Sequence, residues 1–378
     1  MSDLRVLEVI PSLWTGGLER IATQLTLLLR ERVAAVAVAS SGGDPFTDVV
    51  REAGVRLHPI PRPWPRPIPV ARAAAALVPV LRRERPHVVH AHNPGAAAAA
   101  ALARLAARMP DAVIVTTFHG VEPDRVPRAA RVLARTSDVV VAVAPAATEA
   151  LVAAGVPRER TATIPNAVAP VPARPAADVR AEFGAEGRDL VVTVGRYTAQ
   201  KNQAVLLEAL ARLPTERRSR VRALLVGVGE LEDDLRSAVA TLGLGDTATV
   251  VGERFDAVDI TAAAHVFVLS SDWEGLPLAL LEAMSLGRAI VATSVDGIAD
   301  ALQDDVSGVL VPPRDPEALA AALDRVLADP SLRASLAAGA AERARTVFSE
   351  EAMAVRYLEL FGSARDARIR RRSGASPS

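Results

Sequence analysis

Short apolar runs alternate with longer segments of helical spacing along the whole chain of 378 residues. The runs are rich in Val, Ile and Leu, which is typical of strands buried on both faces of a parallel sheet. The alternation predicts strands at 4–10, 34–38, 56–60, 88–91, 112–117, 139–143 and 161–164, and again at 190–194, 223–226, 249–251, 266–269, 289–292 and 308–311. We therefore predict an α/β protein built from βαβ units.

A proline-punctuated stretch at 169–175 interrupts this alternation and has the stiffness of a linker. It predicts an N-terminal domain at 1–172 and a C-terminal domain at 173–348. A helix at 349–363 is expected to pack back towards the first domain, and a tail at 364–378 to lack fixed structure. We expect two doubly wound, Rossmann-like domains that face each other across a cleft, with functional residues in the loops that follow strands.

Composition narrows the class of protein. The 44 basic and 44 acidic residues cancel, which argues against a nucleic-acid partner, and cysteine is absent, which removes disulfides and Cys-based metal sites. No apolar run approaches the ~20 residues of a membrane span, so we expect a cytoplasmic protein. Residues 1–172 hold 20 arginines against 14 acids, and this basic half leaves peripheral contact with the inner face of the cell membrane open.

The first glycine pair follows the first predicted strand. Gly16 and Gly17 lack Cβ atoms, so their main-chain N–H groups can approach a phosphate or sugar oxygen closely, or simply form a tight turn. Neither this pair nor the glycines at 227 and 229 completes a G-x-G-x-x-G sequence. A Rossmann dehydrogenase is therefore disfavoured.

Two cations follow the first strand of the second half. Arg196 offers a planar fork and Lys201 a compact charge, which suits the clamping of a diphosphate. Lys201 is the single lysine beside 43 arginines. Because the chain uses arginine at nearly every other basic position, a surface position without special demands would be expected to hold arginine too. We therefore infer that position 201 requires an ammonium group.

The segment 270–287 contains the richest loop. Glu274 is expected in the loop and Glu282 on the second turn of the following helix, with Pro277 in its first turn. Gly275 and Leu276 would present main-chain N–H groups near the same space. One carboxylate can accept sugar hydroxyls and the other a ribose diol, with a pyrophosphate between them.

The sequence E-G-L-P-L-A-L-L-E-A-M-S-L-G at 274–287 resembles the E-x7-E motif of the retaining GT-B glycosyltransferases of family 4. Gly16–Gly17, the segments 88–93, 116–119 and 164–166, the Arg196–Lys201 pair and the segment 307–313 fit the same pattern, so the resemblance covers nearly the whole chain. It implies a nucleotide-diphospho-sugar donor, with a UDP-sugar favoured over GDP-mannose. It also implies a glycan, lipid-linked or small-molecule acceptor.

The resemblance also implies residue roles. Arg196, Lys201, Glu274 and His119 would be catalytic, with His119 near the anomeric centre. The donor would contact Gly16, Gly17, Arg196, Lys201, Arg254, Glu274, Gly275, Leu276, Pro277 and Glu282. On the acceptor side we place Trp14, Trp64, His92, Asn93 and Asn166.

The resemblance further implies that no metal and no other cofactor is required. His87, His90 and His92 have no carboxylate cluster beside them in the sequence, so we do not predict a metal site there. Retention without a positioned nucleophile favours front-side attack on an oxocarbenium-like centre.

The sequence departs from the family pattern at His265, Ala167 and Asp300, which leaves the identity of the donor open. A UDP-sugar 2-epimerase-like enzyme of the same fold is one alternative. A non-catalytic regulatory protein that binds sugar nucleotides is another.

Overall fold

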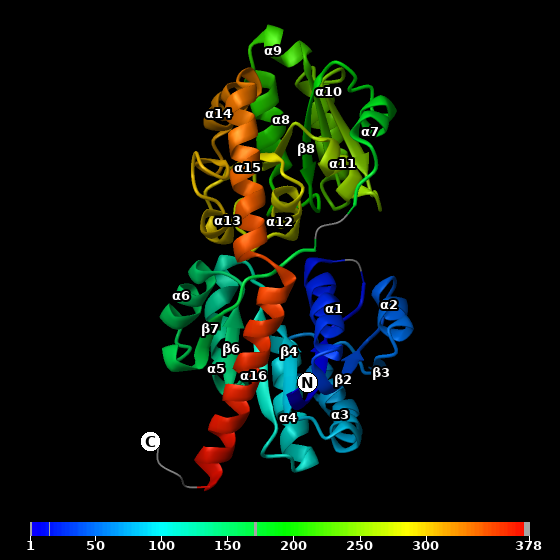
Figure 1. Cartoon of the computed structure of the whole chain (residues 1–378), viewed down its shortest axis with the longest axis vertical. Coiled ribbons are helices and arrows are strands. Elements are labelled where there is room, and N and C mark those ends of the chain that lie inside the picture. Colours follow the sequence, from blue (N-terminus) through cyan, green and yellow to red (C-terminus); the bar gives the residue numbers. More distant parts are fainter. Residues whose placement is uncertain (1, 15, 170–171, 374–378) are drawn as a thin grey trace. The chain divides into compact units, whose positions relative to one another are not determined.

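The computed structural model describes residues 2–14, 16–169 and 172–373. The chain divides into two compact units, each built around one parallel β-sheet (Figure 1). Unit 1 comprises Met1–Asn166 and Glu350–Ser378, and unit 2 comprises Ala167–Ser349. The two parallel sheets confirm the predicted α/β class.

Unit 1 has a seven-stranded sheet of order β3-β2-β1-β4-β5-β6-β7. Most of its strands are continuous apolar runs, because helices cover both faces of the sheet. The strands are β1 (Ser2–Ile10), β2 (Val33–Ser40), β3 (Arg56–Pro59), β4 (Val88–His92), β5 (Val113–Phe118), β6 (Val139–Ala142) and β7 (Thr161–Thr163).

One face of this sheet packs against α3, α4 and α5 through small side chains. The buried alanines of α4 let α3 lie against it, and a Cβ added to Gly95 would come 2.0 Å from the carbonyl oxygen of Pro63. Helices α1 and α16 contact each other and strands of the same sheet (Figure 1). The helices are α1 (Gly17–Arg30), α2 (Phe46–Glu52), α3 (Pro67–Glu84), α4 (Asn93–Ala107), α5 (Val126–Thr136), α6 (Pro145–Ala153) and α16 (Glu350–Ser373), with 3-10 turns at Pro123–Arg125 and Arg158–Arg160.

Unit 2 has a six-stranded sheet of order β10-β9-β8-β11-β12-β13. Its core joins the strands to α8, α10, α14 and α15. The strands are β8 (Asp189–Val194), β9 (Val221–Val226), β10 (Ala248–Gly252), β11 (Val266–Leu269), β12 (Ala289–Thr293) and β13 (Val309–Val311). The helices are α7 (Ala176–Glu182), α8 (Gln203–Arg212), α9 (Thr215–Ser219), α10 (Glu232–Thr241), α11 (Ala257–Ala263), α12 (Leu278–Ser285), α13 (Asp296–Ala301), α14 (Pro316–Ala328) and α15 (Pro330–Val347).

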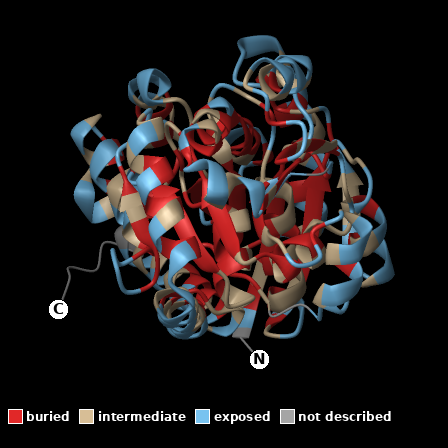
Figure 2. Cartoon of the chain, turned by 90° about the horizontal axis from the view of Figure 1, so that it is seen from above, coloured by how far each residue is buried: buried red, intermediate tan, exposed pale blue. Residues whose placement is uncertain are grey.

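Local sequence explains where two of these helices begin. Asp315 caps α14 by accepting from the main-chain N–H of Ala318, and Asp329 caps α15 in the same way. A proline follows each aspartate at the first helical position, where its missing N–H costs nothing. Figure 2 shows the strands largely buried and the outer helix faces exposed. No helix among the described residues combines the length and the hydropathy that crossing a bilayer requires.

The structure confirms all thirteen predicted strands within a few residues at their ends. Two boundaries differ. The units meet at 166/167 rather than 172/173, and residues 364–373 continue α16 instead of forming an unstructured tail. Ion pairs of Arg365 with Asp3 and of Arg368 with Asp138 hold this last part of the helix. Residues 170 and 171 of the predicted linker and 374–378 of the predicted tail lie outside the described residues.

Candidate functional site

The sheet of unit 2 reverses its winding direction between β8 and β11. The chain runs from β8 to β9 and β10 on one side and then returns to β11 on the other side of β8. In doubly wound sheets the loops that follow such a pair of strands form the ligand site. These loops are residues 195–202 and 270–277, so the structure brings the predicted Arg196, Lys201 and Glu274 to adjoining loops.

The single lysine of the chain pairs with the first glutamate of the motif. Lys201 Nζ lies 2.5 Å from Glu274 Oε1, and Ser271 Oγ donates to the same oxygen at 2.7 Å. Gln200 Nε2 lies 3.4 Å from Glu274 Oε2. Glu274 is buried, and these donors offset the cost of removing its carboxylate from water. The sequence predicts different ligands for Lys201 and Glu274, and only the fold shows that they contact each other.

Asp272 ties three chain segments together beside this ion pair. Its main-chain N–H donates to the carbonyl of Gln200 at 2.8 Å, and its carboxylate accepts from Asn202 Nδ2 at 3.0 Å and Arg314 Nε at 2.8 Å. Asn202 has φ 44°, a left-handed conformation that asparagine tolerates well. These contacts fix the loop that carries Lys201. Sequence reasoning missed Asn202 and Arg314, and the adjacency of Asn202 to the lysine is the one signal that points to it.

Arg196 is exposed, unlike Lys201. Gln203 Nε2 donates to its main-chain carbonyl at 3.0 Å, which holds the backbone in place. Within the described part of the chain its guanidinium has no hydrogen bond and no ion pair. The Lys201 side chain packs across Gly195, with Cδ 3.4 Å from where a Cβ would lie. The two cations therefore leave the same short loop, one paired and one facing solvent.

The helix of the motif begins one residue later than predicted. Pro277 is the N-cap of α12 rather than a member of its first turn, while Glu282 lies on the second turn as expected. Leu276 is buried. A Cβ on Gly297 would lie 1.5 Å from the carbonyl oxygen of Gly275, so glycine is required at 297 for this approach of two main chains.

The guanidinium of Arg254 forms ion pairs with acidic residues of unit 2. Its guanidinium donates to Asp256 and to Glu182 at 2.7 Å, and its Cζ lies 5.4 Å from the ring centroid of Phe183. The hydrogen bonds with Asp256 raise the pKa of Arg254. A contact between Arg254 and a nucleobase stays a prediction and would have to compete with these pairs.

His265, one of the departures from the pattern of the resemblance, accepts a main-chain hydrogen bond. Its Nδ1 accepts from the N–H of Leu190 at 2.8 Å, and its own N–H donates to the carbonyl of Leu190. Burial, followed by nearby Arg180, lowers the pKa of His265 to about 4. A neutral imidazole can therefore serve here as the acceptor that a carboxylate would provide.

The sheet of unit 1 has a matching reversal between β1 and β4. After β1, Gly16 is the N-cap of α1 and Gly17 its first residue. After β4, Asn93 begins α4 with φ 73°, and its Oδ1 accepts from the main-chain N–H of His119 at 3.3 Å. The predicted Gly16, Gly17, Asn93 and His119 thus lie at the carboxyl edge of this sheet.

Glu8 joins His90 and His92 in a buried cluster, although no carboxylate cluster lies beside these histidines in the sequence. His90 Nδ1 lies 2.8 Å and His92 Nε2 2.9 Å from Glu8 Oε2. Glu8 on β1 is the direct register partner of His90 on β4. The pairing of two strands far apart in the sequence decides this contact, which no local pattern reveals.

The other nitrogens of the cluster have partners as well. His90 Nε2 lies 2.7 Å from Thr117 Oγ1, which lies 2.8 Å from the hydroxyl of Tyr357 on α16. One ligand atom each of Glu8, His90 and His92 lies within 4.8 Å of the others, a spacing that a metal ion can use. In the described part of the chain these atoms already share hydrogen bonds and are completely buried. In this structure the cluster is a buried hydrogen-bonded network.

The direction of the hydrogen bonds in this network determines which ring nitrogen of His119 carries the proton. Burial opposes the charge on Glu8, but His90 and His92 lower its pKa to about 2. Burial lowers the pKa of His92, and that of His119 well below its usual value. An ionised carboxylate only accepts, so neutral His92 donates from Nε2 and accepts at Nδ1. His119 Nε2 lies 3.0 Å from that Nδ1 and carries the proton, which leaves His119 Nδ1 as an acceptor.

The remaining residues predicted on the acceptor side differ in exposure. Trp14 is 58% and Trp64 54% exposed, and the Arg62 guanidinium lies 4.2 Å from the Trp64 ring centroid. Asn166 is buried. The two indoles have the exposure that acceptor binding requires, whereas Asn166 does not.

We expect Glu8→Gln to change the pH dependence of the free energy of unfolding. The pKa of Glu8 is about 2 in the folded chain against an ordinary 4.5, so its carboxylate contributes stability that is complete above pH 4.5 and is lost as the pH falls towards 2. This difference between the two pKa values corresponds to about 3 kcal/mol of the free energy of unfolding. Urea unfolding between pH 6 and pH 2 should show a steeper loss for the wild type than for the variant. Parallel curves would contradict the assignment of an ionised Glu8.

Two doubly wound domains, each with polar loops at its switch point, define the GT-B fold. The crystal structure of Anabaena HepE in complex with UDP and glucose matches 95% of this chain and 100% of that chain, with a TM-score of 0.84 and 22% identity. A model described as "Glycosyl transferases group 1" matches residues 177–343, and one described as "Glycosyltransferase Family 4" matches residues 15–170. Together they cover most of the sequence, and the chain belongs to this family of glycosyltransferases.

Curated relatives match parts of the chain. The lipopolysaccharide core biosynthesis glycosyltransferase LpsE of Rhizobium meliloti (strain 1021) is 34% identical over 174 residues, 46% of this chain and 50% of LpsE. The alpha-D-kanosaminyltransferase of Streptomyces kanamyceticus is 34% identical over 168 residues, 44% of this chain and 43% of that enzyme. The matched region thus spans about half the length of these relatives.

Proposed function

We propose that the chain is a retaining, metal-independent glycosyltransferase that transfers a hexosyl group from a nucleotide-diphospho-sugar to an acceptor hydroxyl. The observation that carries the proposal is the arrangement after β8 and β11, where Lys201 pairs with buried Glu274 and exposed Arg196 leaves the same loop. Two cations beside a carboxylate are suited to a ligand that has both a diphosphate and sugar hydroxyls. A metal is not needed in this scheme because Arg196 and Lys201 supply the positive charge.

In the proposed reaction the bond between the anomeric carbon and the diphosphate oxygen breaks, and a bond to the acceptor oxygen forms on the same face of the sugar. Arg196 and Lys201 stabilise the negative charge that develops on the departing diphosphate. That diphosphate accepts the proton of the acceptor hydroxyl, so no separate base is required. Glu282 would bind the ribose, and Glu274 would accept from hydroxyls of the donor sugar. The network from Glu8 through His92 supports a role for His119 Nδ1 as an acceptor for a sugar hydroxyl.

The names of the relatives indicate the biological setting of the proposal. LpsE acts in lipopolysaccharide core biosynthesis by its name, and HepE was crystallised with UDP and glucose. We therefore favour a UDP-sugar donor and a role in glycan, cell-envelope or glycoconjugate biosynthesis. Peripheral contact with an anionic membrane through the basic N-terminal unit belongs to the same proposal.

Calorimetric titration with UDP, GDP, UDP-glucose, UDP-N-acetylglucosamine and GDP-mannose tests it. We expect micromolar binding of one nucleotide class, weakened at least about tenfold in Lys201→Ala because a charge-assisted hydrogen bond is lost. Transfer of the sugar to an acceptor should follow for the donor that binds. Epimerised sugar released without any acceptor would identify an epimerase, and binding without turnover of any donor would favour the regulatory alternative.

A further inference from the structure

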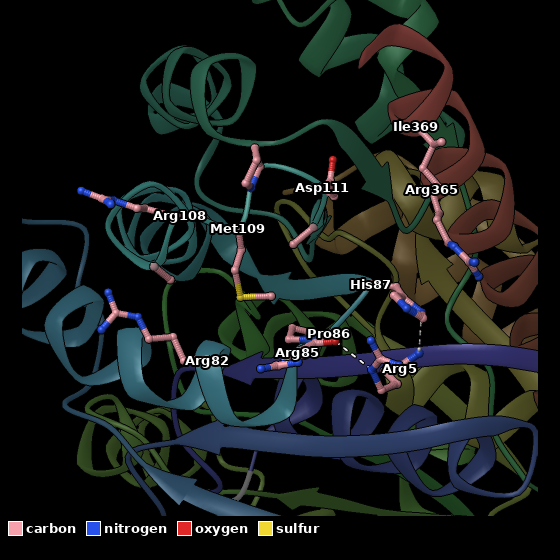
Figure 3. A pocket seen from close by; sticks show the side chains of 13 residues that line it. Arg5, Arg82, Arg85, Pro86, His87, Arg108, Met109, Asp111, Arg365 and Ile369 are labelled. Atoms are coloured by element: carbon pink, nitrogen blue, oxygen red, sulfur yellow. Dashed lines mark hydrogen bonds between the residues drawn. The ribbon is translucent and has the colours of Figure 1, made fainter. Parts of the chain in front are cut away.

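A pocket lies in unit 1, at the edge of the sheet opposite to the strand ends described above. It is formed where β1, β4 and β5 begin and where α3 and α4 end, with α16 on one side (Figure 3). Its volume is about 560 Å³, which lies in the range of small-molecule sites. No residue assigned above to donor or acceptor binding lines it.

The pocket is strongly cationic. Its lining contains five arginines and one acidic residue, Asp111. Figure 3 shows Arg5 and Arg365 on one side and Arg82 and Arg108 on the other. Burial, followed by the charges of Arg5 and Arg365, lowers the pKa of His87, which also lines the pocket. The arginines therefore create a positive potential that an anion would neutralise.

Most of these guanidinium groups lack a carboxylate partner among the described residues. Arg365 pairs with Asp3 at 2.7 Å, but Arg5 Nε donates to the carbonyl of Arg85 at 2.8 Å and Arg82 Nη2 to the carbonyl of Ala106 at 3.2 Å. Main-chain carbonyls orient a guanidinium without cancelling its charge. Unlike many arginines on the surface of this chain, these retain their positive charge and their remaining N–H donors for a ligand.

Two of the arginines occupy positions where glycine or asparagine would cost less. Arg85 ends α3 with φ 45°, and Arg108 ends α4 with φ 59°. This left-handed conformation carries a steric cost for residues with a Cβ, and helices commonly end there in glycine. Both side chains are exposed at the rim of the same pocket. Stabilising a helix end does not require arginine at the left-handed position itself, so a second role for these charges is indicated.

Apolar side chains also line the pocket. Met109 and Pro86 lie between the two groups of arginines, and Ile369 lies at the edge beyond Arg365 (Figure 3). A small inorganic ion would leave these surfaces uncovered, whereas an organic phosphate presents an anionic group and a less polar remainder. Guanidinium forks match phosphate oxygens in geometry and bind them bidentately.

We propose that this pocket is a second, phosphate-recognising site that binds the phosphate or pyrophosphate group of an organic ligand at a place separate from the donor site of unit 2. A free phosphate ester and the headgroup of an anionic lipid offer the same chemistry. The site does not depend on the glycosyltransferase proposal, because no residue is shared between them.

The test separates charge from helix stability. The double variant Arg85→Asn/Arg108→Asn removes two charges but places asparagine, which tolerates the left-handed conformation. We expect its melting temperature to be equal to or higher than that of the wild type, while its affinity for pyrophosphate falls at least about tenfold. A role limited to capping the helices would give the reverse, a lower melting temperature and unchanged affinity.

Pyrophosphate is also expected to bind the proposed donor site, so binding at that site must first be removed by substitution. Calorimetric titration is carried out on the full chain with Arg196→Ala and Lys201→Ala, with and without the two asparagine substitutions. The matched control replaces Arg30 and Arg72, two exposed arginines of unit 1 outside the pocket, by glutamine. Binding that survives in the control and is lost in the asparagine variant supports the site.

A second arm identifies the source of the phosphate. The same proteins are sedimented with vesicles of phosphatidylcholine containing phosphatidylglycerol. Vesicle binding lost only in the asparagine variant indicates a lipid headgroup, whereas pyrophosphate binding without vesicle binding indicates a soluble ester. If the silenced protein binds neither probe, or if the asparagine variant binds both as the control does, the proposal is overturned.

Discussion

Lys201→Ala is expected to lower the turnover of sugar transfer at least ~100-fold, the size of effect seen when one donor that stabilises a developing negative charge is removed. Arg196, the other cation of this loop, is proposed to contact the same diphosphate from five residues earlier in the chain, so it adds to the Lys201 ammonium group and does not replace it. Initial rates at saturating donor measure the loss. The loss in rate should exceed the loss in affinity for the nucleotide, since the charge on the leaving diphosphate grows during the reaction.

Lys201→Arg is the informative companion variant. The Lys201 and Glu274 side chains are largely buried, and an arginine there is longer and ends in a planar fork, so its guanidinium cannot take the position of the compact ammonium group. We therefore expect the arginine variant to remain strongly impaired although it keeps the charge. Wild-type rates in Lys201→Arg would show that a compact ammonium is not required, and wild-type rates in Lys201→Ala would remove the proposed role altogether.

Glu274→Gln is expected to lower turnover by a similar factor of about 100 while it leaves nucleotide affinity unchanged or increases it. The carboxylate neutralises Lys201 in the ligand-free chain, and a diphosphate has to compete with it for that charge. Glutamine frees the ammonium for the diphosphate but offers the donor sugar a weaker acceptor. Calorimetric titration with the nucleoside diphosphate and rate measurements on the same preparations separate the two effects.

Glu208→Gln provides the control for this prediction. Glu208 forms an exposed ion pair with Arg212 on α8, in the same unit as Glu274, and exposed pairs contribute little. Both its rate and its affinity should match those of the wild type. A Glu274→Gln variant that loses affinity and rate in equal measure would show that Glu274 contributes to binding the nucleotide and not to the chemical step.

The strands were predictable because parallel strands covered on both faces are continuous apolar runs, and each run is local in sequence. Functional residues such as Lys201 and Glu274 could be predicted for the same reason, because they lie in the loops directly after two of these runs. The last turns of α16 were not predictable from composition. Their run of arginines is typical of a solvated tail. Only the fold shows that Arg365 pairs with Asp3 and Arg368 with Asp138, each more than 200 residues away in the sequence.

By itself the sequence determined the α/β class, the two-domain organisation and the residue types in the loops after β8 and β11. Only the tertiary structure decided which of those side chains contact each other. Lys201 faces Glu274 because β8 and β11 are neighbours despite two intervening strands, and Glu8 reaches His92 and through it His119 because β1 pairs with β4. The physical reason is that apolar periodicity specifies each strand locally, whereas strand order and register depend on how whole helices and strands pack together.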